Sequence, residues 1–419
     1  MPFELSGFGL LVVAAWGAVL LWLAGAFLTL RGIYRQRPLA PPGDDRLTDG
    51  SAPFVSVLVP ARNEERRVLE ESVRSMLAQD YGRCEVVAVN DRSTDATGPI
   101  LRSIAADDAR LRVVEGAEPP PGWLGKPHAM RQALSAARGE WVLATDADML
   151  YEPEALRTSV ARALDARLDA LTLLPQVVCL AFWERVFMPT FGWFMLLARP
   201  LERVNDPRRG ESLGIGGFFL IRRETLERVG GYDAVRDQVA EDLSLADVLK
   251  SSGARLRVEN GQLLVRTRMH PTFADIWEAF SRNLFAGAEF ALWRTALGAG
   301  SVILFSVTPP LLALLCALAL LAGGDAALWR PLFVPSLLVW LLQVFTLAVV
   351  NRVWGIPLRY ALTAPLGHAL FVAIFLNSAA RIASGRGVTW KGRRLYERAG
   401  VQPPGRPRPR PNGPASADD

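Results

Sequence analysis

Four long stretches of the chain contain no Asp, Glu, Lys or Arg. They cover residues 8–30, 299–324, 331–350 and 361–380. Each is about as long as, or longer than, the ~20 apolar residues that a membrane-spanning helix needs. Residues 51–290, between the first and the second stretch, alternate apolar and polar positions as soluble proteins do. The pattern therefore predicts a globular domain between an N-terminal membrane anchor and a C-terminal bundle of transmembrane helices.

The first apolar stretch has the features of an uncleaved anchor rather than a cleaved signal peptide. It is longer than the ~7–15 residues of a signal-peptide core, and no basic residue precedes it. The basic flank at residues 31–37 places the following domain in the cytoplasm by the positive-inside rule. We therefore expect a multi-pass protein of the inner cell membrane with its soluble domain in the cytoplasm.

The number of C-terminal spans is left open by the charges around them. Three single spans after a cytoplasmic domain would place the strongly basic residues 381–398 outside the cell, against the positive-inside rule. Two arrangements avoid this conflict. One segment is re-entrant or broken, with Thr308–Pro310 as the candidate break, or the last segment lies along the membrane interface.

Within the soluble stretch, short apolar runs alternate with amphipathic segments of ten or more residues. Such alternation predicts an α/β fold with a mainly parallel sheet, in which ligands bind at the carboxyl ends of the strands. The predicted strands are 54–60, 84–90, 111–116, 140–147 and 168–175, and the predicted helices are 63–79, 93–106, 126–137 and 152–164. Polar clusters follow three of these strands directly, in the sequences ARNEE, NDRSTD and TDAD.

Composition changes this picture in two respects. The net charge is +5, but the basic residues collect beside the apolar segments, which favours anionic lipid over nucleic acid as their partner. The three cysteines, Cys84, Cys179 and Cys316, have no metal-ligand spacing and are interpreted as buried thiols. Residues 382–419 form a basic, Pro/Arg-rich tail, whose end from residue 401 is predicted to be disordered.

Asp146 and Asp148 are the strongest candidates for metal binding. If the backbone there is extended, both carboxylates point to the same side and need a cation between them. Oxygen ligands of this kind suit Mg²⁺ or Mn²⁺, which also hold substrate phosphates. The alternative is that one aspartate caps the next helix and the other lies on the surface.

The polar clusters after the first two strands contain further candidates with structural alternatives. Arg62 and Glu64 face a ligand in one interpretation, while in the other Asn63 simply caps the following helix. Asp91 is placed to accept hydrogen bonds from a base or ribose. Asp95 is interpreted as a helix cap.

Two helix starts carry charged candidates. Lys126 begins a predicted helix, where its side chain either binds a phosphate or is solvated. His128, two residues later, either contacts a diphosphate or packs against the helix. Glu241 and Asp242 begin a later helix. There an acidic pair either compensates the helix dipole or supplies a general base beside a metal.

These motifs in their order resemble those of a family 2 glycosyltransferase with a GT-A fold, over residues 51–290. The segments that carry the resemblance are VPARNEE, NDRSTD, TDAD, GGFFLIRRETLERVGGYD and AEDLSLADVLKSSG. The terminal apolar segments and the closing VTWKGRRLYE are similar to those of membrane-bound, lipid-modifying members. The segment GWLGKPHA resembles the hopanoid-biosynthesis-associated and carotenoid-type enzymes and, more distantly, ceramide glucosyltransferases.

The resemblance implies a role for each matching position. The first nucleotide-contacting loop would comprise Pro60, Arg62, Asn63 and Glu64. Asp91 would read a uracil, although the usual aspartate pair is Asn90–Asp91 here. Asp146 and Asp148 would hold the metal and the ribose-diphosphate. Asp242 would be the catalytic base, with Glu241 beside it in the acceptor pocket.

One motif departs from the family pattern. Processive polysaccharide synthases carry Gln-x-x-Arg-Trp before their membrane helices, whereas residues 277–287 here contain Arg282–Asn283 with no tryptophan after them. This argues against a polymerising enzyme, while Arg282 is retained as a candidate for pairing with the diphosphate.

Together these features predict three parts and one activity. Residues 1–31 would be the anchor, 51–292 the GT-A domain with possible interfacial helices at 181–204 and 272–293, and 296–381 the transmembrane bundle. The expected activity is that of an inverting, Mg²⁺- or Mn²⁺-dependent hexosyltransferase, which moves a sugar from a nucleotide donor of the UDP type to the hydroxyl of a membrane lipid. A processive polysaccharide synthase and a non-catalytic nucleotide-binding membrane protein are the alternatives, and no nucleic-acid partner is expected.

Overall fold

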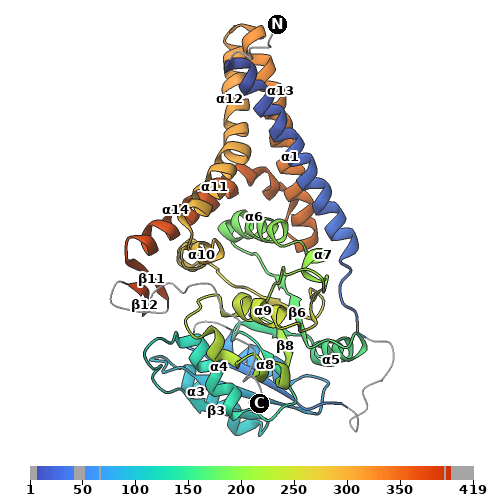
Figure 1. Ribbon diagram of the computed structural model, residues 1–419, viewed down its shortest axis with the longest axis vertical. Helices are drawn as coiled ribbons and strands as arrows, with labels where there is room; N and C mark the ends of the chain where they lie inside the picture. Colours follow the sequence, from blue (N-terminus) through green and yellow to red (C-terminus); the bar gives the residue numbers. More distant parts are fainter. Residues whose placement is uncertain (1–6, 42–51, 66–67, 391–392, 398–419) are drawn as a thin grey trace, which may run out of the picture. The chain divides into compact units, whose positions relative to one another are not determined.

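The chain divides into two compact units in the computed structural model, which describes residues 7–41, 52–65, 68–390 and 393–397 (Figure 1). We call residues 1–35, 179–198 and 270–388 the helical unit. The sheet unit comprises residues 36–178, 199–269 and 389–419. Each unit is described by itself.

The sheet unit is built on a seven-stranded sheet with the strand order β3-β2-β1-β4-β8-β6-β9. Neighbouring strands are parallel except at β8, which runs antiparallel to both β4 and β6. The strands are β1 Val55–Ala61, β2 Cys84–Asn90, β3 Leu111–Glu115, β4 Trp141–Ala144, β6 Ala170–Leu174, β8 Phe219–Arg222 and β9 Leu256–Asn260. The expected α/β class with a mainly parallel sheet is confirmed.

Helices cover both faces of this sheet because successive strand residues point to opposite sides. On β1, Val57 and Val59 pack with α2, α3 and α5, whereas Leu58 packs with α4, α8 and α9. The helices are α2 Leu69–Leu77, α3 Thr97–Asp107, α4 Gly125–Ala136, α5 Ala155–Asp165, α7 Leu201–Val204, α8 Arg223–Arg228, η1 Gly231–Val235 and α9 Glu241–Ser251. Because both faces of the sheet are buried, the sequences of its strands are continuous apolar runs.

The remaining strands form two small sheets. A three-stranded sheet has the order β5-β10-β7, formed by Met149–Tyr151, Val265–Thr267 and Gln176–Val177. Two further strands, β11 Arg386–Trp390 and β12 Arg393–Glu397, pair with each other. Residues 398–419, which include the tail predicted to be disordered, lie outside the described residues.

The predicted elements recur with small shifts at their ends. The strand at 84–90 has the predicted limits, and the helix predicted at 126–137 is α4, shifted by one residue. The largest error concerns the helix predicted from residue 63, because α2 begins at Leu69. Periodicity did not reveal the turn that precedes this helix.

The helical unit contains four helices that are long and apolar enough to cross a membrane: Gly7–Arg35, Leu292–Leu321, Ala326–Trp354 and Leu358–Ala383. They correspond to the four apolar stretches of the sequence. The elements of this unit are α1 Gly7–Arg35, α6 Phe182–Ala198, α10 Phe273–Gly287, α11 Leu292–Val302, η2 Ile303–Val307, α12 Thr308–Leu321, α13 Ala326–Trp354, η3 Leu358–Thr363 and α14 Ala364–Ala383. The direction of each span stays a prediction.

Thr308–Pro310 does not break the second of these helices. Residues Ile303–Val307 adopt a π-helical turn, and α12 begins at Thr308 with prolines at its second and third positions. Proline fits the first turn of a helix because it lacks only an N–H that would be unpaired there anyway. The extra residue of the π-helical turn keeps the two parts in one helix.

Aromatic side chains join α6 to α1 inside the helical unit. The rings of Trp22 and Trp193 stack with centroids 4.9 Å apart, and Trp193 donates its indole N–H to the Thr29 hydroxyl at 2.7 Å. This helix therefore packs against an apolar helix of its own unit. The interfacial position expected for residues 181–204 stays a prediction, as does that of residues 272–293. The three cysteines are free and buried, as expected.

Candidate active site

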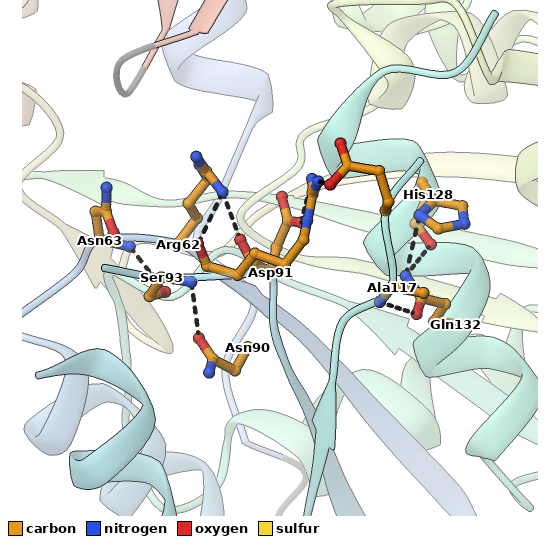
Figure 2. A network of polar contacts seen from close by, with 10 residues as sticks. Arg62, Asn63, Asn90, Asp91, Ser93, Ala117, His128 and Gln132 are labelled. Atoms are coloured by element: carbon orange, nitrogen blue, oxygen red, sulfur yellow. Dashed lines mark hydrogen bonds and ion pairs between the residues drawn. The ribbon is translucent and has the colours of Figure 1, made fainter. Parts of the chain in front are cut away.

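The loops after β1 and β2 are joined by hydrogen bonds at the carboxyl edge of the sheet (Figure 2). Asn63 donates its backbone N–H to the Ser93 hydroxyl at 3.1 Å, and its side-chain oxygen accepts the N–H of Thr94 at 2.9 Å. The backbone of Asn63 is left-handed, with φ of 50°, which asparagine adopts more readily than most residues. The capping alternative for Asn63 is wrong, because its side chain joins two loops ahead of α2.

Arg62 and Asp91 hold the same edge from opposite loops. Nη1 of Arg62 donates to the backbone carbonyls of Asp91 and Arg92 at 2.6 and 3.1 Å (Figure 2). The Asp91 side chain is buried, and its Oδ1 accepts two hydrogen bonds from the Arg92 guanidinium at 3.1 and 3.0 Å. Arg92 also pairs with Glu118. Asp91 is thus a fixed acceptor at the end of β2.

The remaining residues of the first loop are also fixed in place. Pro60 lies within β1, opposite Val89 of β2. Glu64 is buried, and its backbone N–H donates to the Thr97 hydroxyl at 2.7 Å. Asp95 accepts the backbone N–H of Thr97, the first residue of α3, at 3.0 Å, although Ala96 and not Asp95 occupies the N-cap position of that helix. Pro60, Arg62, Asn63, Glu64 and Asp91 therefore all lie along one loop pair.

A second group of charged side chains gathers beyond the end of β4. The ammonium of Lys126, in the first turn of α4, lies 2.7 Å from Oδ1 of Asp146 and 2.6 Å from Oε1 of Glu241. Glu241 is the first residue of α9 and is followed by Asp242. The alternative of a solvated Lys126 is wrong, because two carboxylates hold its ammonium.

Asp146 and Asp148 do not lie on extended backbone. Strand β4 ends at Ala144, residues 147–148 form a turn, and β5 begins at Met149. The same-side argument drawn from strand geometry is therefore wrong. The two carboxylates are instead presented by a tight turn, and both residues are partly exposed.

Glycines bring the backbone against this acidic group. The N–H of Gly216 donates to Oδ2 of Asp242 at 2.7 Å. A Cβ at Gly216 would lie 3.0 Å from Asp242 Oδ2, 3.3 Å from Lys126 Nζ and 3.4 Å from Asp146 Oδ2. A Cβ at Gly214 would lie 2.2 Å from the carbonyl oxygen of Asp242. Gly214 and Gly216 are therefore explained by the close approach of their backbone to Asp242 at the start of α9.

Burial and mutual charge shift the pKa values in this group. Burial raises the pKa of Glu241 to about 7, against the opposing effect of the Lys126 ammonium. Burial also raises the pKa of Asp242, although Lys126 and the N–H groups of Leu243 and Gly216 counteract it. Burial alone would lower the pKa of Lys126, but the surrounding carboxylates, Asp146 first, raise it well above its usual value. Lys126 is therefore the permanent cation of the group.

Lys126, Glu241 and Asp242 line a small cavity that the sequence did not reveal. Gly216 and Tyr232 contribute to its wall together with Met130, Ala144, Thr145, Phe219 and Leu245. Tyr232 follows the glycine pair at residues 230–231, in which Gly230 has φ of 92° and ends α8. The sequence GGYD marks the turn, but it does not indicate that the tyrosine reaches a charged cavity.

His128 and Arg282 do not belong to the charged group as the structure describes it. His128 is buried and shares a hydrogen bond of 3.1 Å with the side chain of Gln132 (Figure 2). Its ring also packs edge-on against Trp123. Burial lowers the pKa of His128, which favours a neutral ring. This matches the packing alternative. Arg282 lies on α10 of the helical unit, where its Nε donates to Asn283 at 3.2 Å, and its pairing with a diphosphate stays a prediction.

The carboxylates of Asp146 and Asp148 fit a divalent cation that is shared with a substrate. Within the described ranges, no group of three or more His, Cys, Asp or Glu side chains forms a complete protein-made metal site. Mg²⁺ in particular is commonly held by one or two carboxylates, with water and substrate phosphates as its other ligands. Oxygen donors on an exposed turn match that pattern.

The chain is similar to several known proteins. The chain is 26% identical over 238 residues to 4,4'-diaponeurosporenoate glycosyltransferase of Staphylococcus aureus, covering 56% of this chain and 61% of that protein. Among solved structures, a mannosyltransferase of Pyrobaculum calidifontis, in complex with GDP-Man and Mn²⁺, is 22% identical with a TM-score of 0.49, covering 88% of this chain and 98% of that chain. Residues 1–349 of S. aureus TarS, in complex with UDP-GlcNAc, are 17% identical with a TM-score of 0.40, covering 83% and 98%.

A family model matches a large part of the sheet unit, including Lys126 and Asp146 of the charged group. Residues 56–230, from the second residue of β1 to Gly230 after α8, match the model for glycosyl transferase family 2. Glu241 and Asp242 follow shortly after the matched stretch, and the similarity to the staphylococcal relative spans about three fifths of that protein's length. Residues 56–230 of this chain are therefore a family 2 glycosyltransferase domain.

Proposed function

We propose that this protein transfers a sugar from a nucleotide-sugar donor to a hydroxyl group of a membrane lipid, with inversion at the anomeric carbon. The observation that carries the proposal is the meeting of Lys126, Asp146, Glu241 and Asp242 beside the end of β4, within or next to a family 2 domain. Parallel sheets bind their ligands at this edge. A cation and several carboxylates, partly buried, suit a reaction in which a diphosphate leaves and a hydroxyl loses its proton.

The loops after β1 and β2 would bind the nucleotide. Asp91 is a buried carboxylate that Arg92 holds in one orientation, so it can accept hydrogen bonds from the N–H of a base. Uracil offers one such N–H, which favours a UDP-linked donor. Arg62, Asn63 and Glu64 keep the two loops together and so preserve the shape of this subsite.

Lys126 would bind the diphosphate of the donor. Its ammonium stays charged at any physiological pH because three carboxylates surround it. It also lies in the first turn of α4, where the positive end of the helix dipole favours anions. Asp146 and Asp148 would hold a Mg²⁺ or Mn²⁺ ion, and such an ion, when bound, offsets negative charge on the leaving diphosphate.

Asp242 would act as the general base. The acceptor hydroxyl oxygen forms a bond to the anomeric carbon as its proton passes to the Asp242 carboxylate. The bond between that carbon and the diphosphate oxygen breaks, and the nucleoside diphosphate leaves with the bonding electron pair beside Lys126. Because the attack occurs once and from the opposite face, the configuration inverts. A buried carboxylate with a raised pKa is the stronger base for this step.

Glu241 would hold both Lys126 and the acceptor. One of its oxygens contacts the Lys126 ammonium, and the residue borders the same cavity as Asp242. Its position next to the base in sequence places a second carboxylate beside the attacking hydroxyl. This arrangement orients the acceptor instead of supplying a second base.

Two observations support a lipid acceptor. In the described part of the chain, four helices are long and apolar enough to cross a membrane, so the domain would work next to the bilayer. The staphylococcal relative is named as acting on 4,4'-diaponeurosporenoate, which is a carotenoid and therefore a membrane-soluble acceptor. A hopanoid, a carotenoid or another isoprenoid or sphingolipid-like alcohol would be the corresponding class here.

Transfer of radiolabelled sugar tests the proposal. Membranes that contain the protein are incubated with labelled UDP-glucose, UDP-galactose, UDP-GlcNAc or GDP-mannose and Mg²⁺ or Mn²⁺, and are then extracted with chloroform and methanol. We expect label in the organic phase for at least one donor, and none with Asp242→Asn membranes. Label only in an insoluble polymer would indicate a polysaccharide synthase. The absence of label with every donor would refute the proposal.

A further inference from the structure

The hydroxyl group of Tyr232 is buried without a hydrogen-bond partner among the described residues. Tyr232 is the second residue of η1, which begins directly after the left-handed Gly230, and it is 2% exposed. Buried polar groups in folded proteins are nearly always hydrogen-bonded to protein or to ordered water. The position of this hydroxyl therefore requires an explanation.

Tyr232 lines the same cavity as Lys126, Glu241 and Asp242, and the charges of these three residues act on its hydroxyl. The other side chains of the wall are mainly apolar, so a polar occupant would find its partners on the charged side and at Tyr232. A water molecule in a buried site needs two to four polar partners, and this cavity provides them. Polar groups that face each other beyond hydrogen-bond distance are commonly bridged by such a water.

Glu241 is the acceptor that best suits this hydroxyl. One oxygen of Glu241 is held by Lys126 at 2.6 Å, whereas Asp242 already accepts N–H groups with both oxygens, from Leu243 and Gly216. Burial first, and then the nearby Glu241 charge, raise the pKa of Tyr232, so its hydroxyl keeps its proton and acts as a donor. A donor next to a carboxylate with one engaged oxygen is a complementary pair.

We propose that Tyr232 is a positioning residue, whose hydroxyl donates a hydrogen bond to a water molecule that in turn donates to the carboxylate of Glu241. This inference rests on the proposed function, because it assigns Tyr232 a part in keeping the acceptor-facing carboxylate in place. Tyr232 itself does not touch the reacting atoms.

Removal of the single oxygen atom tests the role in turnover. Tyr232→Phe should lower kcat about tenfold, as expected for the loss of one hydrogen bond to a charged group, and should leave the KM and Kd for the nucleotide sugar unchanged. The matched control is Tyr81→Phe, because Tyr81 is buried in the same unit and its hydroxyl donates to the Pro53 carbonyl at 2.5 Å. We expect wild-type kcat for Tyr81→Phe. An unchanged kcat in Tyr232→Phe would overturn the proposal.

A double-mutant comparison separates an action through Glu241 from a structural effect. If the hydroxyl works through that carboxylate, Tyr232→Phe should change the remaining rate of Glu241→Gln by less than about twofold. An equal tenfold loss in both backgrounds would show that Tyr232 acts independently of Glu241 and would overturn the proposal.

The bridging water can be sought without any activity. A high-resolution experimental structure of the whole protein should contain an ordered water within hydrogen-bond distance of both the Tyr232 hydroxyl and a Glu241 oxygen. The same water should be absent from Tyr232→Phe. A dry cavity in the wild-type protein would overturn the proposal. If the wild-type protein bound no nucleotide sugar, the proposed function would fail, while this structural comparison would still decide on the bridge.

Discussion

The ammonium of Lys126 and the carboxylate of Glu241 form an ion pair of 2.6 Å that joins the first turn of α4 to the first residue of α9. On its other side the same ammonium contacts Asp146 at 2.7 Å. Lys126 thereby balances carboxylates from two separate segments of the chain. Its replacement would leave these acids close together without a cation.

Lys126→Met should weaken nucleotide-sugar binding by about 100-fold. The diphosphate loses the ammonium that would pair with it, and the carboxylates that remain repel it. The affinity is measured by isothermal titration calorimetry with the nucleotide sugar that supports transfer. Lys126→Arg serves as the control because it keeps the charge, and it should retain binding better than the methionine variant. Equal affinity of Lys126→Met and the wild type would contradict the assignment of Lys126 to the diphosphate.

Gly216→Ala should reduce kcat by about tenfold or more, since small displacements of reacting groups have large effects on rate. The added Cβ would lie 3.0 Å from Oδ2 of Asp242 and 3.3 Å from Lys126 Nζ, so one of these groups must move. Gly210→Ala is the matched control, because a Cβ at that position has no neighbour within 4 Å. Steady-state rates of the two variants test this directly. Similar rates would show that the site tolerates the displacement.

The rate of transfer should depend on pH through the carboxylates of α9. Burial raises the pKa of Glu241 to about 7, so this group is protonated below that pH and ionised above it. We expect the rate at saturating donor to fall as the pH drops below about 7, and to level off above it. The profile is measured as the rate of lipid labelling at a series of pH values between about 5.5 and 9. A rate that stays constant down to the acidic end would contradict the raised pKa.

The same shift has a consequence for stability with the opposite sign. The pKa of Glu241 is higher in the folded protein than its usual value of 4.5, so the folded state binds more protons between 4.5 and about 7. This residue's contribution to the free energy of unfolding therefore decreases as the pH rises through that window. Glu241→Gln should remove this contribution. Thermal unfolding midpoints of both proteins at several pH values check it, and identical pH dependence of the two would contradict it.

Two substitutions of Asn63 distinguish the effect of backbone strain in the first loop from the effect of its side-chain hydrogen bond. Asn63→Ala loses the bond to Thr94 and places alanine at φ of 50°, whereas Asn63→Gly loses only the bond. We expect both variants to bind the donor more weakly than the wild type. The alanine variant should be worse by about 1 kcal/mol, because the left-handed conformation costs alanine more than glycine. Donor titrations provide the comparison, and equal affinities of the two variants would argue against a strained loop.

The sequence predicted the strands well because both faces of the sheet are covered. Val57 and Val59 on one side and Leu58 on the other make β1 apolar throughout, and that signal is local. It also placed Asp91 and Asp146 after strand ends, which parallel topology brings to one edge. Contacts between distant segments were not predictable in this way. Nothing near Lys126 indicates that its ammonium would reach Glu241.

Other features were hidden because they depend on backbone details. The turn at Asp146–Asp148 replaced the expected extended backbone, and Asn63 joined two loops instead of capping a helix. The position of Tyr232 at the cavity depends on how η1 packs against α9. A periodic pattern of apolar residues does not predict such packing. The position of Arg282 relative to the donor depends on how the two units meet, so its role stays a prediction.

The central claim is that Asp242 removes the proton from the acceptor hydroxyl at a site that Lys126 and Asp146 prepare for the diphosphate. Asp242→Asn keeps the shape of the side chain but removes the base. The most direct measurement compares sugar transfer to lipid with donor affinity in this single variant. The account predicts a loss of transfer of about 1,000-fold or more with nearly unchanged donor affinity. Transfer at close to the wild-type rate would contradict it.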